Sequence, residues 1–108
     1  MTTRLLLVPA ALLALAACSA SPAAPVSADQ ASCVNFSNAL HYGDPSQGSD
    51  RSEITRLAGR PEDPELARYH NEMAAKVGKR LPWSIAAFRF ADRCDALFTG
   101  LMIDRDKL

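Results

Sequence analysis

The chain has 108 residues, with 12 basic and 12 acidic side chains and a formal net charge of zero. Its length predicts a single domain. Its balanced charge argues against broad binding to nucleic acid, which needs a surplus of basic residues on one face. Lys79 and Arg80 are the only adjacent basic pair, and we interpret them as solvated charges in a turn. The sequence therefore predicts no nucleic-acid partner.

The amino-terminal segment has the composition of an export signal. Arg4 supplies a charged head, and residues 5–17 are then uncharged and apolar apart from one proline. Thirteen helical residues rise about 20 Å, which is too short for a hydrocarbon core about 30 Å thick. A charged head followed by a short apolar stretch is typical of a signal peptide rather than of a permanent transmembrane helix.

The residues Leu15-Ala16-Ala17-Cys18 at the end of this stretch resemble the lipobox of bacterial lipoproteins. In that family an aliphatic residue and two small residues precede an obligatory cysteine. The resemblance implies that Cys18 receives a diacylglyceryl thioether and that residues 1–17 are removed as the signal peptide. An ordinary secretory signal with an incidental cysteine is the alternative. Because two or three acyl chains hold a protein on a bilayer, we expect lipid anchoring to the extracytoplasmic side of the cell membrane.

The next segment separates the cysteine from the part of the chain that folds. Residues 18–28 continue with small side chains and proline, which predicts a flexible, lipid-anchored linker. Residues 19–28, when fully extended, reach at most about 35 Å, so the domain would stay close to the membrane. We expect a helical domain over residues 29–104 and a tail over residues 105–108.

Beyond the linker the apolar spacing is helical, and no stretch alternates as a strand does. Ser27 and Gln30 form a capping box for a first helix, which residues 43–45 end. The residues expected on its inner face are Cys33, Val34, Phe36 and Leu40. A short helix is predicted over residues 50–58, with Ile54 and Leu57 directed inward and Gly59 at its end.

A third helix is predicted from its cap, because Asp63, Pro64 and Glu65 supply a capping side chain, a first-turn proline and an acid that complements the helix dipole. Its apolar stripe comprises Leu66, Tyr69, His70, Met73, Ala74 and Val77. Gly78 is its expected C-cap. A last helix is predicted over residues 83–99. Its apolar side comprises Ala87, Phe88, Phe90, Ala91, Cys94, Leu97, Phe98 and Leu101. The fold class is therefore all-α, a small bundle of three main helices plus one short helix.

Two cysteines remain beyond the linker, and both are expected on inner helix faces. Cys33 belongs to the first helix and Cys94 to the last. The export signal places them in a compartment that permits disulfides, and lipidation of Cys18 leaves an even number. We predict a Cys33–Cys94 disulfide that staples the bundle, with two buried reduced thiols as the alternative. No Cys-x-x-Cys or histidine spacing favours a metal pair.

Two pairs of residues, His41-Tyr42 and Tyr69-His70, point toward a cofactor. Histidine is the commonest transition-metal ligand, and tyrosine can ligate haem iron. If the first and third helices pack together, the pairs approach each other, with Met73 one turn from Tyr69. The alternative is that Tyr69 and His70 belong to the apolar stripe and His41 to a frayed helix end. We retain His41, Tyr69 and His70 as candidate cofactor residues and predict no resident cofactor.

No catalytic motif appears: the chain has no Gly-x-Ser-x-Gly, His-Glu-x-x-His or Gly-rich phosphate loop. Helix capping explains the acidic cluster Glu62, Asp63 and Glu65. Trp83, which follows Pro82, either seals one end of the bundle or stands exposed as a partner anchor.

The Ala-rich signal, the linker and the paired cysteines resemble those of small helical envelope lipoproteins of actinobacteria. We therefore expect a non-enzymatic, membrane-anchored lipoprotein that binds an envelope protein or another envelope component. A small-molecule carrier, with haem, metal or lipid inside the bundle, is the alternative.

Overall fold

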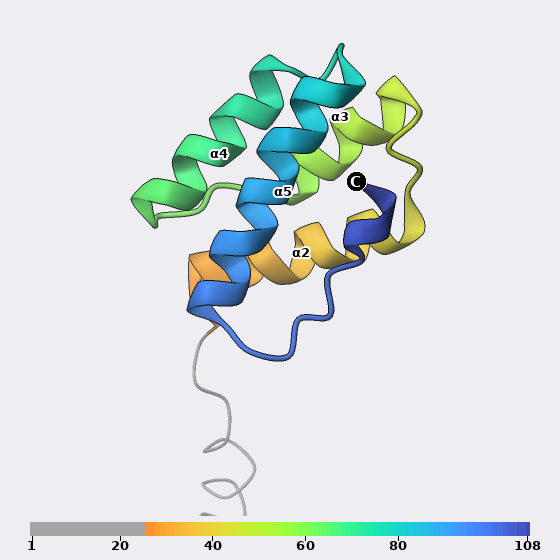
Figure 1. Cartoon of the computed structure of the whole chain (residues 1–108). Helices are drawn as coiled ribbons and strands as arrows, with labels where there is room; N and C mark the ends of the chain where they lie inside the picture. The colour runs from red at the N-terminus through yellow and green to blue at the C-terminus, as the bar shows by residue number, and fades with distance from the viewer. Residues whose placement is uncertain (1–25) are drawn as a thin grey trace, which may run out of the picture.

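The computed structural model describes residues 26–108, so the predicted signal peptide and Cys18 lie outside the described part of the chain. Within that part the chain is helical and has no strand. Its elements are α2 (Ala28–Tyr42), α3 (Gly48–Leu57), α4 (Pro64–Ala75), α5 (Arg80–Leu97) and the 3₁₀ helix η1 (Arg105–Lys107) (Figure 1). The predicted all-α fold is confirmed, with α3 as the short helix.

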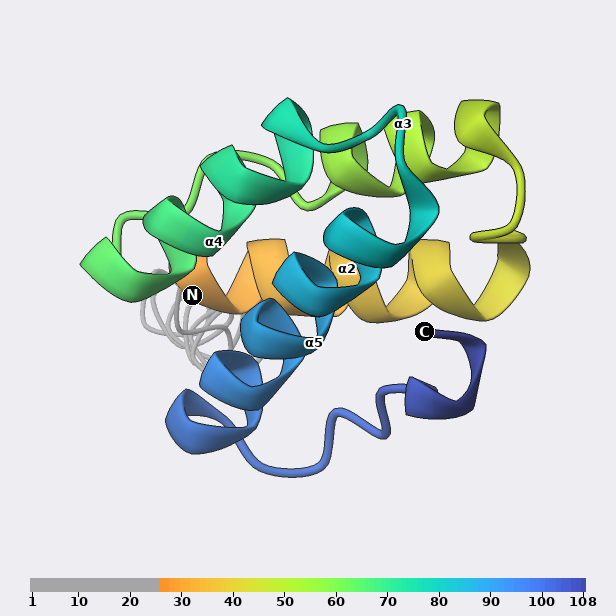
Figure 2. The ribbon, with the colours of Figure 1, turned by 45° about the horizontal axis from the view of Figure 1, so that its top comes forward.

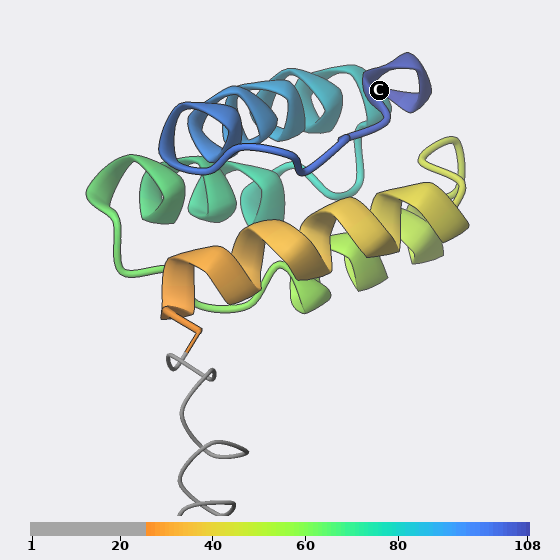
Figure 3. The ribbon, with the colours of Figure 1, turned by 90° about the horizontal axis from the view of Figure 1, so that it is seen from below.

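The four α-helices pack as two antiparallel pairs that form two layers (Figures 1, 2 and 3). One layer contains α2 and α3, and the other contains α4 and α5. The segment that follows α5 returns across the domain to the C-terminal end of α2, where Lys107 Nζ donates to the Leu40 carbonyl oxygen at 3.1 Å. The predicted tail, residues 105–108, is thus packed against the first helix.

The predicted helix starts at Ser27 and Asp63 are confirmed by their capping hydrogen bonds. Ser27 Oγ accepts from the Gln30 backbone N–H at 3.1 Å. Asp63 Oδ2 accepts from the Leu66 N–H at 3.0 Å. Each side chain satisfies a backbone donor that the first turn of a helix leaves without a partner. Gly43 follows α2 as predicted, and a Cβ there would lie 2.9 Å from the Ala39 carbonyl oxygen.

The start of α5 differs from its prediction. The helix begins at Arg80 rather than at Trp83, so Lys79 is its cap and Pro82 lies inside its first turn. Proline is tolerated there because the first N–H groups of a helix have no acceptor within the helix. The prediction that Lys79 and Arg80 occupy a turn is therefore wrong for Arg80.

The end of α4 also differs from its prediction, because Gly78 does not cap it. The helix ends at Ala75, and Lys76 is the C-cap with φ of −114°. Its N–H donates to the carbonyl oxygens of Glu72 and Met73, each at 3.1 Å. These hydrogen bonds satisfy carbonyl groups at the end of α4 without a residue in the left-handed conformation. Gly78 is therefore not required to end the helix.

The hydrophobic core lies between the two layers and is crossed by the predicted disulfide. Its largest fully buried side chains are Trp83, Phe36 and Phe90. The rings of Phe36 and Phe90 lie 4.9 Å apart between centroids. Cys33 of α2 and Cys94 of α5 form the disulfide, with a Cα–Cα distance of 5.6 Å. The disulfide prediction is confirmed. Of the two alternatives for Trp83, burial is the one that the structure shows, and the exposed partner anchor is excluded.

Several apolar residues that were expected to face inward are exposed. They are Val34, Leu57, Ala74, Phe88 and Leu97. The cause is clearest in α5, which carries apolar side chains on more than one face. Its buried face is the one that carries Trp83 and Phe90, and each helix layer covers only one side of the other. Phe88 therefore points away from the core.

Candidate functional site

A groove lies between α2 and α3 on the surface of the domain. It is open to solvent and has a volume of about 490 Å³, which lies within the range of small-ligand sites. Its lining residues are Asn35, Asn38, Ala39, Tyr42, Gly43, Asp50, Glu53, Ile54 and Leu57. Most of them are exposed side chains of the two helices, so the groove lies outside the core.

The α2 side of the groove presents amide groups and one aromatic ring. Asn35, Asn38 and Tyr42 recur at helical spacing and lie on one face of α2. The buried residues of this helix, which include Cys33 and Phe36, lie on another face. Tyr42 is 86% exposed. An exposed ring beside amides that both donate and accept hydrogen bonds is suited to contact with a partner.

The α3 side supplies an apolar floor and an anionic edge. Ile54 is buried at the floor, and Leu57 is exposed beside it. Glu53 at the rim accepts from the Arg56 guanidinium through both carboxylate oxygens, at 2.9 and 2.5 Å. These hydrogen bonds lower the pKa of Glu53 below its ordinary value, so the carboxylate remains charged at neutral pH. The groove therefore fits an apolar segment that carries a cation.

The candidate cofactor residues have other partners. His70 Nε2 lies 2.8 Å from the Thr55 carbonyl oxygen, so one ring nitrogen is in a hydrogen bond to α3. Tyr69 packs, partly buried, against the core. His41 is exposed, with its ring edge-on to Tyr42 at 4.8 Å between centroids. The neighbours of α2 are mainly α3 and α5 rather than α4, so the structure does not join the two pairs into one site.

Metal-binding geometry can be examined across residues 26–108. No three or more His, Cys, Asp or Glu side chains of this range are grouped as ligands of one ion. The acidic cluster predicted at the start of α4 has a structural role, as its contacts show.

A charged clamp joins the start of α2 to the start of α4 and the end of α5. Asp29 Oδ1 accepts from the N–H groups of Glu62 and Asp63 at 2.7 and 2.9 Å. Asp63 in turn accepts from Arg93 through both carboxylate oxygens, at 2.8 and 3.0 Å. The Arg93 hydrogen bonds, followed by the backbone N–H of Leu66, lower the pKa of Asp63 from 3.8 to about 2. The capping interpretation of this cluster is consistent with these contacts.

A buried arginine, which the sequence did not predict, holds α3 in place. The Arg51 guanidinium donates to the Val77 carbonyl oxygen and to the Pro45 carbonyl oxygen, each at 2.8 Å. The Thr55 hydroxyl donates to the Arg51 carbonyl oxygen at 2.7 Å and accepts from Trp83 Nε1 at 2.9 Å. These bonds satisfy buried polar groups and tie α3 to the loop before it, to the loop between α4 and α5, and to α5 itself.

The groove was not predicted from the sequence, although one signal for it is present there. Asn35, Asn38 and Tyr42 share a helix face that carries no other function in the packing. No pattern among the residues of α3 indicates the groove, because only the tertiary fold determines that α3 packs beside α2. Burial of Arg51 had no signal at all, since an arginine in a short polar helix is ordinarily exposed.

Comparisons of this chain with models of protein families, with curated proteins and with solved structures find no match. No helix between Val26 and Leu108 is long and apolar enough to cross a membrane. The function proposed next depends on the chain's own residues and their geometry.

Proposed function

We propose that this protein is an exported, non-enzymatic lipoprotein whose helical domain binds an envelope protein through the groove between α2 and α3. The main support for this proposal is the role of each of the three cysteines. Cys33 and Cys94 form a buried disulfide, as exported proteins commonly do. Cys18 is then the remaining cysteine, and it lies at the end of a sequence that resembles a lipobox.

The linker supports a role at the membrane surface. Residues 19–27 separate Cys18 from the start of α2. When fully extended they span about 30 Å, which is comparable with the size of a small domain. Confining the domain within that distance of a bilayer raises its local concentration toward other envelope components. A groove of modest size would then suffice for function without tight binding.

The groove supports a peptide segment as the partner. Its floor of Ile54 and Leu57 can receive apolar side chains, and its rim offers the Glu53 carboxylate. The ion pair of Glu53 with Arg56 is exposed, with 52% and 68% of the two side chains accessible. Such surface pairs contribute little to stability, so a lysine or arginine of the partner can replace Arg56 at small cost. The expected partner segment is apolar and carries at least one basic residue.

Photocrosslinking in intact cells tests this proposal. A photoreactive residue at Asn38, in the groove, is compared with the same residue at Asn71, an exposed asparagine of α4. We expect one discrete crosslinked protein from position 38 and none from position 71. Leu57→Asp in the same chain should abolish the crosslink, because a charge replaces an apolar wall of the groove. Equal crosslinking from both positions, or insensitivity to Leu57→Asp, would contradict the proposed binding surface.

A small ligand in the same groove is the second candidate function, and the groove's volume favours it. Inside the bundle the space is filled by side chains such as Trp83, Phe36 and Phe90, so a carrier of this fold would use the surface groove. Native mass measurement of protein purified from its own membrane distinguishes the two functions. Extra non-covalent mass that Leu57→Asp removes supports the ligand, whereas a co-purifying protein supports the partner.

A further inference from the structure

An exposed apolar ridge runs along the N-terminal half of α5. Leu81, Ile85 and Phe88 follow one another at i, i+4 and i+7 and are 75%, 53% and 43% exposed. With Ser84, Arg89 and Leu108 they line a shallow hollow on this helix. By helical spacing the ridge lies on a different face of α5 from the buried Trp83 and Phe90, and Leu108 of the C-terminal segment borders it. Adjacent apolar side chains of this exposure mark an interaction surface.

The surroundings of the ridge are cationic. Residues 76–91 contain four basic and no acidic side chains. The basic residues are Lys76, Lys79, Arg80 and Arg89, and all four are exposed. Arg89 lies 3.8 Å from Glu72 of α4. Arg80 is near enough to Asp44 to add to the Ser46 hydrogen bonds that lower the pKa of that carboxyl. An apolar ridge bordered by lysine and arginine has the composition of surfaces that lie in the headgroup region of a bilayer.

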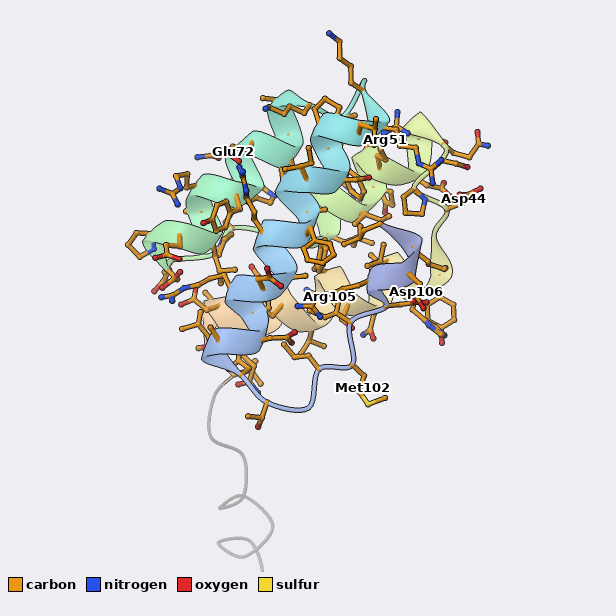
Figure 4. The ribbon with its side chains drawn as sticks, in the orientation of Figure 1. Asp44, Arg51, Glu72, Met102, Arg105 and Asp106 are labelled. Carbon is orange, nitrogen blue, oxygen red and sulfur yellow. A yellow bond between two sulfur atoms is a disulfide. The ribbon has the colours of Figure 1, made fainter. Side chains whose placement is uncertain are left out.

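Two acidic residues farther along α5 share one arginine. Arg105 donates to Asp92 at 2.9 Å and to Asp95 at 2.5 Å. Its guanidinium also lies 5.5 Å from the centroid of the Phe88 ring. Figure 4 shows Arg105 beside α5, on the segment that returns toward α2. The three groups together keep one net negative charge, which lies toward the C-terminal half of α5. Lys76, Lys79 and Arg80 lie at or before the start of the helix, so the cationic end of the ridge is its N-terminal end.

We propose that this face of α5 binds an anionic phospholipid bilayer, an inference that rests on the proposed anchoring at Cys18. The apolar ridge would enter the boundary between headgroups and acyl chains, while the four cations contact lipid phosphates. A second copy of the chain is a poorer occupant, because a symmetric dimer about the ridge would bring the same cations against one another. The linker, about 30 Å when extended, is long enough to let the domain lie on the surface to which it is anchored.

This docking assigns an orientation to the domain. The α4–α5 layer would face the bilayer, and the α2–α3 layer would face away from it (Figures 2 and 3). The groove between α2 and α3 would then be directed toward the aqueous compartment, where an envelope partner can reach it. Each lysine or arginine close to an anionic surface contributes about a fivefold factor to binding, so the four together make a large, salt-sensitive contribution.

Quenching of tryptophan fluorescence by brominated lipids tests the docking. The lipidated protein carrying Ile85→Trp is reconstituted in phosphatidylcholine vesicles with and without phosphatidylglycerol. Val34→Trp, at an exposed position of α2, is the matched control, and unsubstituted protein gives the background of the buried Trp83. We expect the tryptophan at position 85 to be quenched only in vesicles that contain phosphatidylglycerol, and the tryptophan at position 34 in neither.

Charge reversal completes the experiment. Adding Lys79→Glu and Arg80→Glu to the Ile85→Trp protein should abolish most of the quenching, while the protein still floats with the vesicles. Absence of quenching in floating protein, quenching that ignores lipid charge, or concentration-dependent self-association through this face would each overturn the docking while leaving the anchor intact. Protein that fails to float with any vesicle would overturn the anchoring itself, and the docking with it.

Discussion

The two ends of α5 are fastened to the rest of the fold by different chemistry. Near its C-terminus, Cys94 is bonded to Cys33 of α2, and Arg93 pairs with the Asp63 carboxylate. Near its N-terminus, the indole of Trp83 donates to Thr55 of α3, whose helix is held by Arg51. One end thus depends on a covalent bond and a carboxylate, and the other on hydrogen bonds to neutral acceptors.

This difference means that each end should respond to a different change in conditions. A disulfide responds to reductant, and a carboxylate responds to acid. Arginine does not lose its proton in proteins, and carbonyl oxygens do not titrate in the ordinary range. We therefore expect reduction and acid to loosen the C-terminal end of α5, while the N-terminal end changes only when its residues are substituted.

The largest effect is expected from loss of the disulfide. The double variant Cys33→Ala/Cys94→Ala should be less stable by about 4 kcal/mol, because the bond closes a loop across a sequence separation of 61. Urea unfolding monitored by circular dichroism measures this. Reduced wild-type protein is the control and should approach the stability of the double variant. Identical unfolding of wild-type protein with and without reductant would show that the bond contributes nothing.

The next largest effect is expected from substitution of Arg51, which holds α3 near the N-terminal end of α5. Arg51→Met should lower the free energy of unfolding by about 2–3 kcal/mol, because two buried carbonyl oxygens lose a charged donor. Arg60→Met, at an exposed position, should change it by less than about 0.5 kcal/mol. The loss at position 51 should be the same in reduced and oxidised protein. A loss that disappears on reduction would show that the two ends are not independent.

The carboxylate clamp should give a smaller, pH-dependent effect. Asp63→Asn should cost about 1–2 kcal/mol at pH 7, through a weaker cap and loss of the charge-assisted bonds to Arg93. Because the pKa of Asp63 is lowered from 3.8 to about 2, its stabilisation is complete above about pH 4 and is lost as the pH falls toward 2.

Denaturation between pH 7 and pH 2 measures this dependence. The stability of Asp63→Asn should fall less over the acid range than that of the wild type. Glu62→Gln is the neighbouring control, because the structure uses the backbone N–H of Glu62 in the clamp. If Glu62→Gln reduces the pH dependence of stability as much as Asp63→Asn does, the acid sensitivity does not come specifically from Asp63.

The smallest effect is expected where the returning C-terminal segment meets α2. Lys107 Nζ donates to the carbonyl oxygens of His41 and Gly43 at 2.5 and 2.9 Å, which complements the negative end of the helix dipole. Lys107→Met should therefore cost about 0.5–1 kcal/mol. Arg60→Met, at an exposed position between α3 and α4, is the comparison. Equal effects of the two substitutions on the unfolding midpoint would argue against a cap.

Local signals in the sequence predicted much of the fold. The side chains of Ser27 and Asp63 cap their helices through hydrogen bonds within one turn, so the sequence alone indicates both helix starts. The structure confirms both. The Cys33–Cys94 pair followed from counting cysteines and from their position on inner helix faces. These features depend on neighbours in sequence or on a small set of pairing choices, so they can be recognised without knowing the tertiary arrangement.

Features that depend on which helix faces which could not be predicted in the same way. Phe88 lies on an apolar side of α5, yet no layer covers that side. Arg51 is buried because Val77, in the loop after α4, and Pro45, in the loop before α3, supply carbonyl oxygens at its guanidinium. The groove likewise exists only because α2 and α3 pair, and the sequence of either helix alone does not show the other.

The intact mass of the protein, purified from the membranes of its own host, tests the central proposal most directly. We predict a polypeptide that begins at Cys18, carries the added mass of acyl chains and has no free thiol before reduction. The Cys18→Ala protein, prepared in the same way, should lack the acyl mass. A chain that begins at Met1 without acyl mass would contradict the anchor and, with it, the proposed location of the domain.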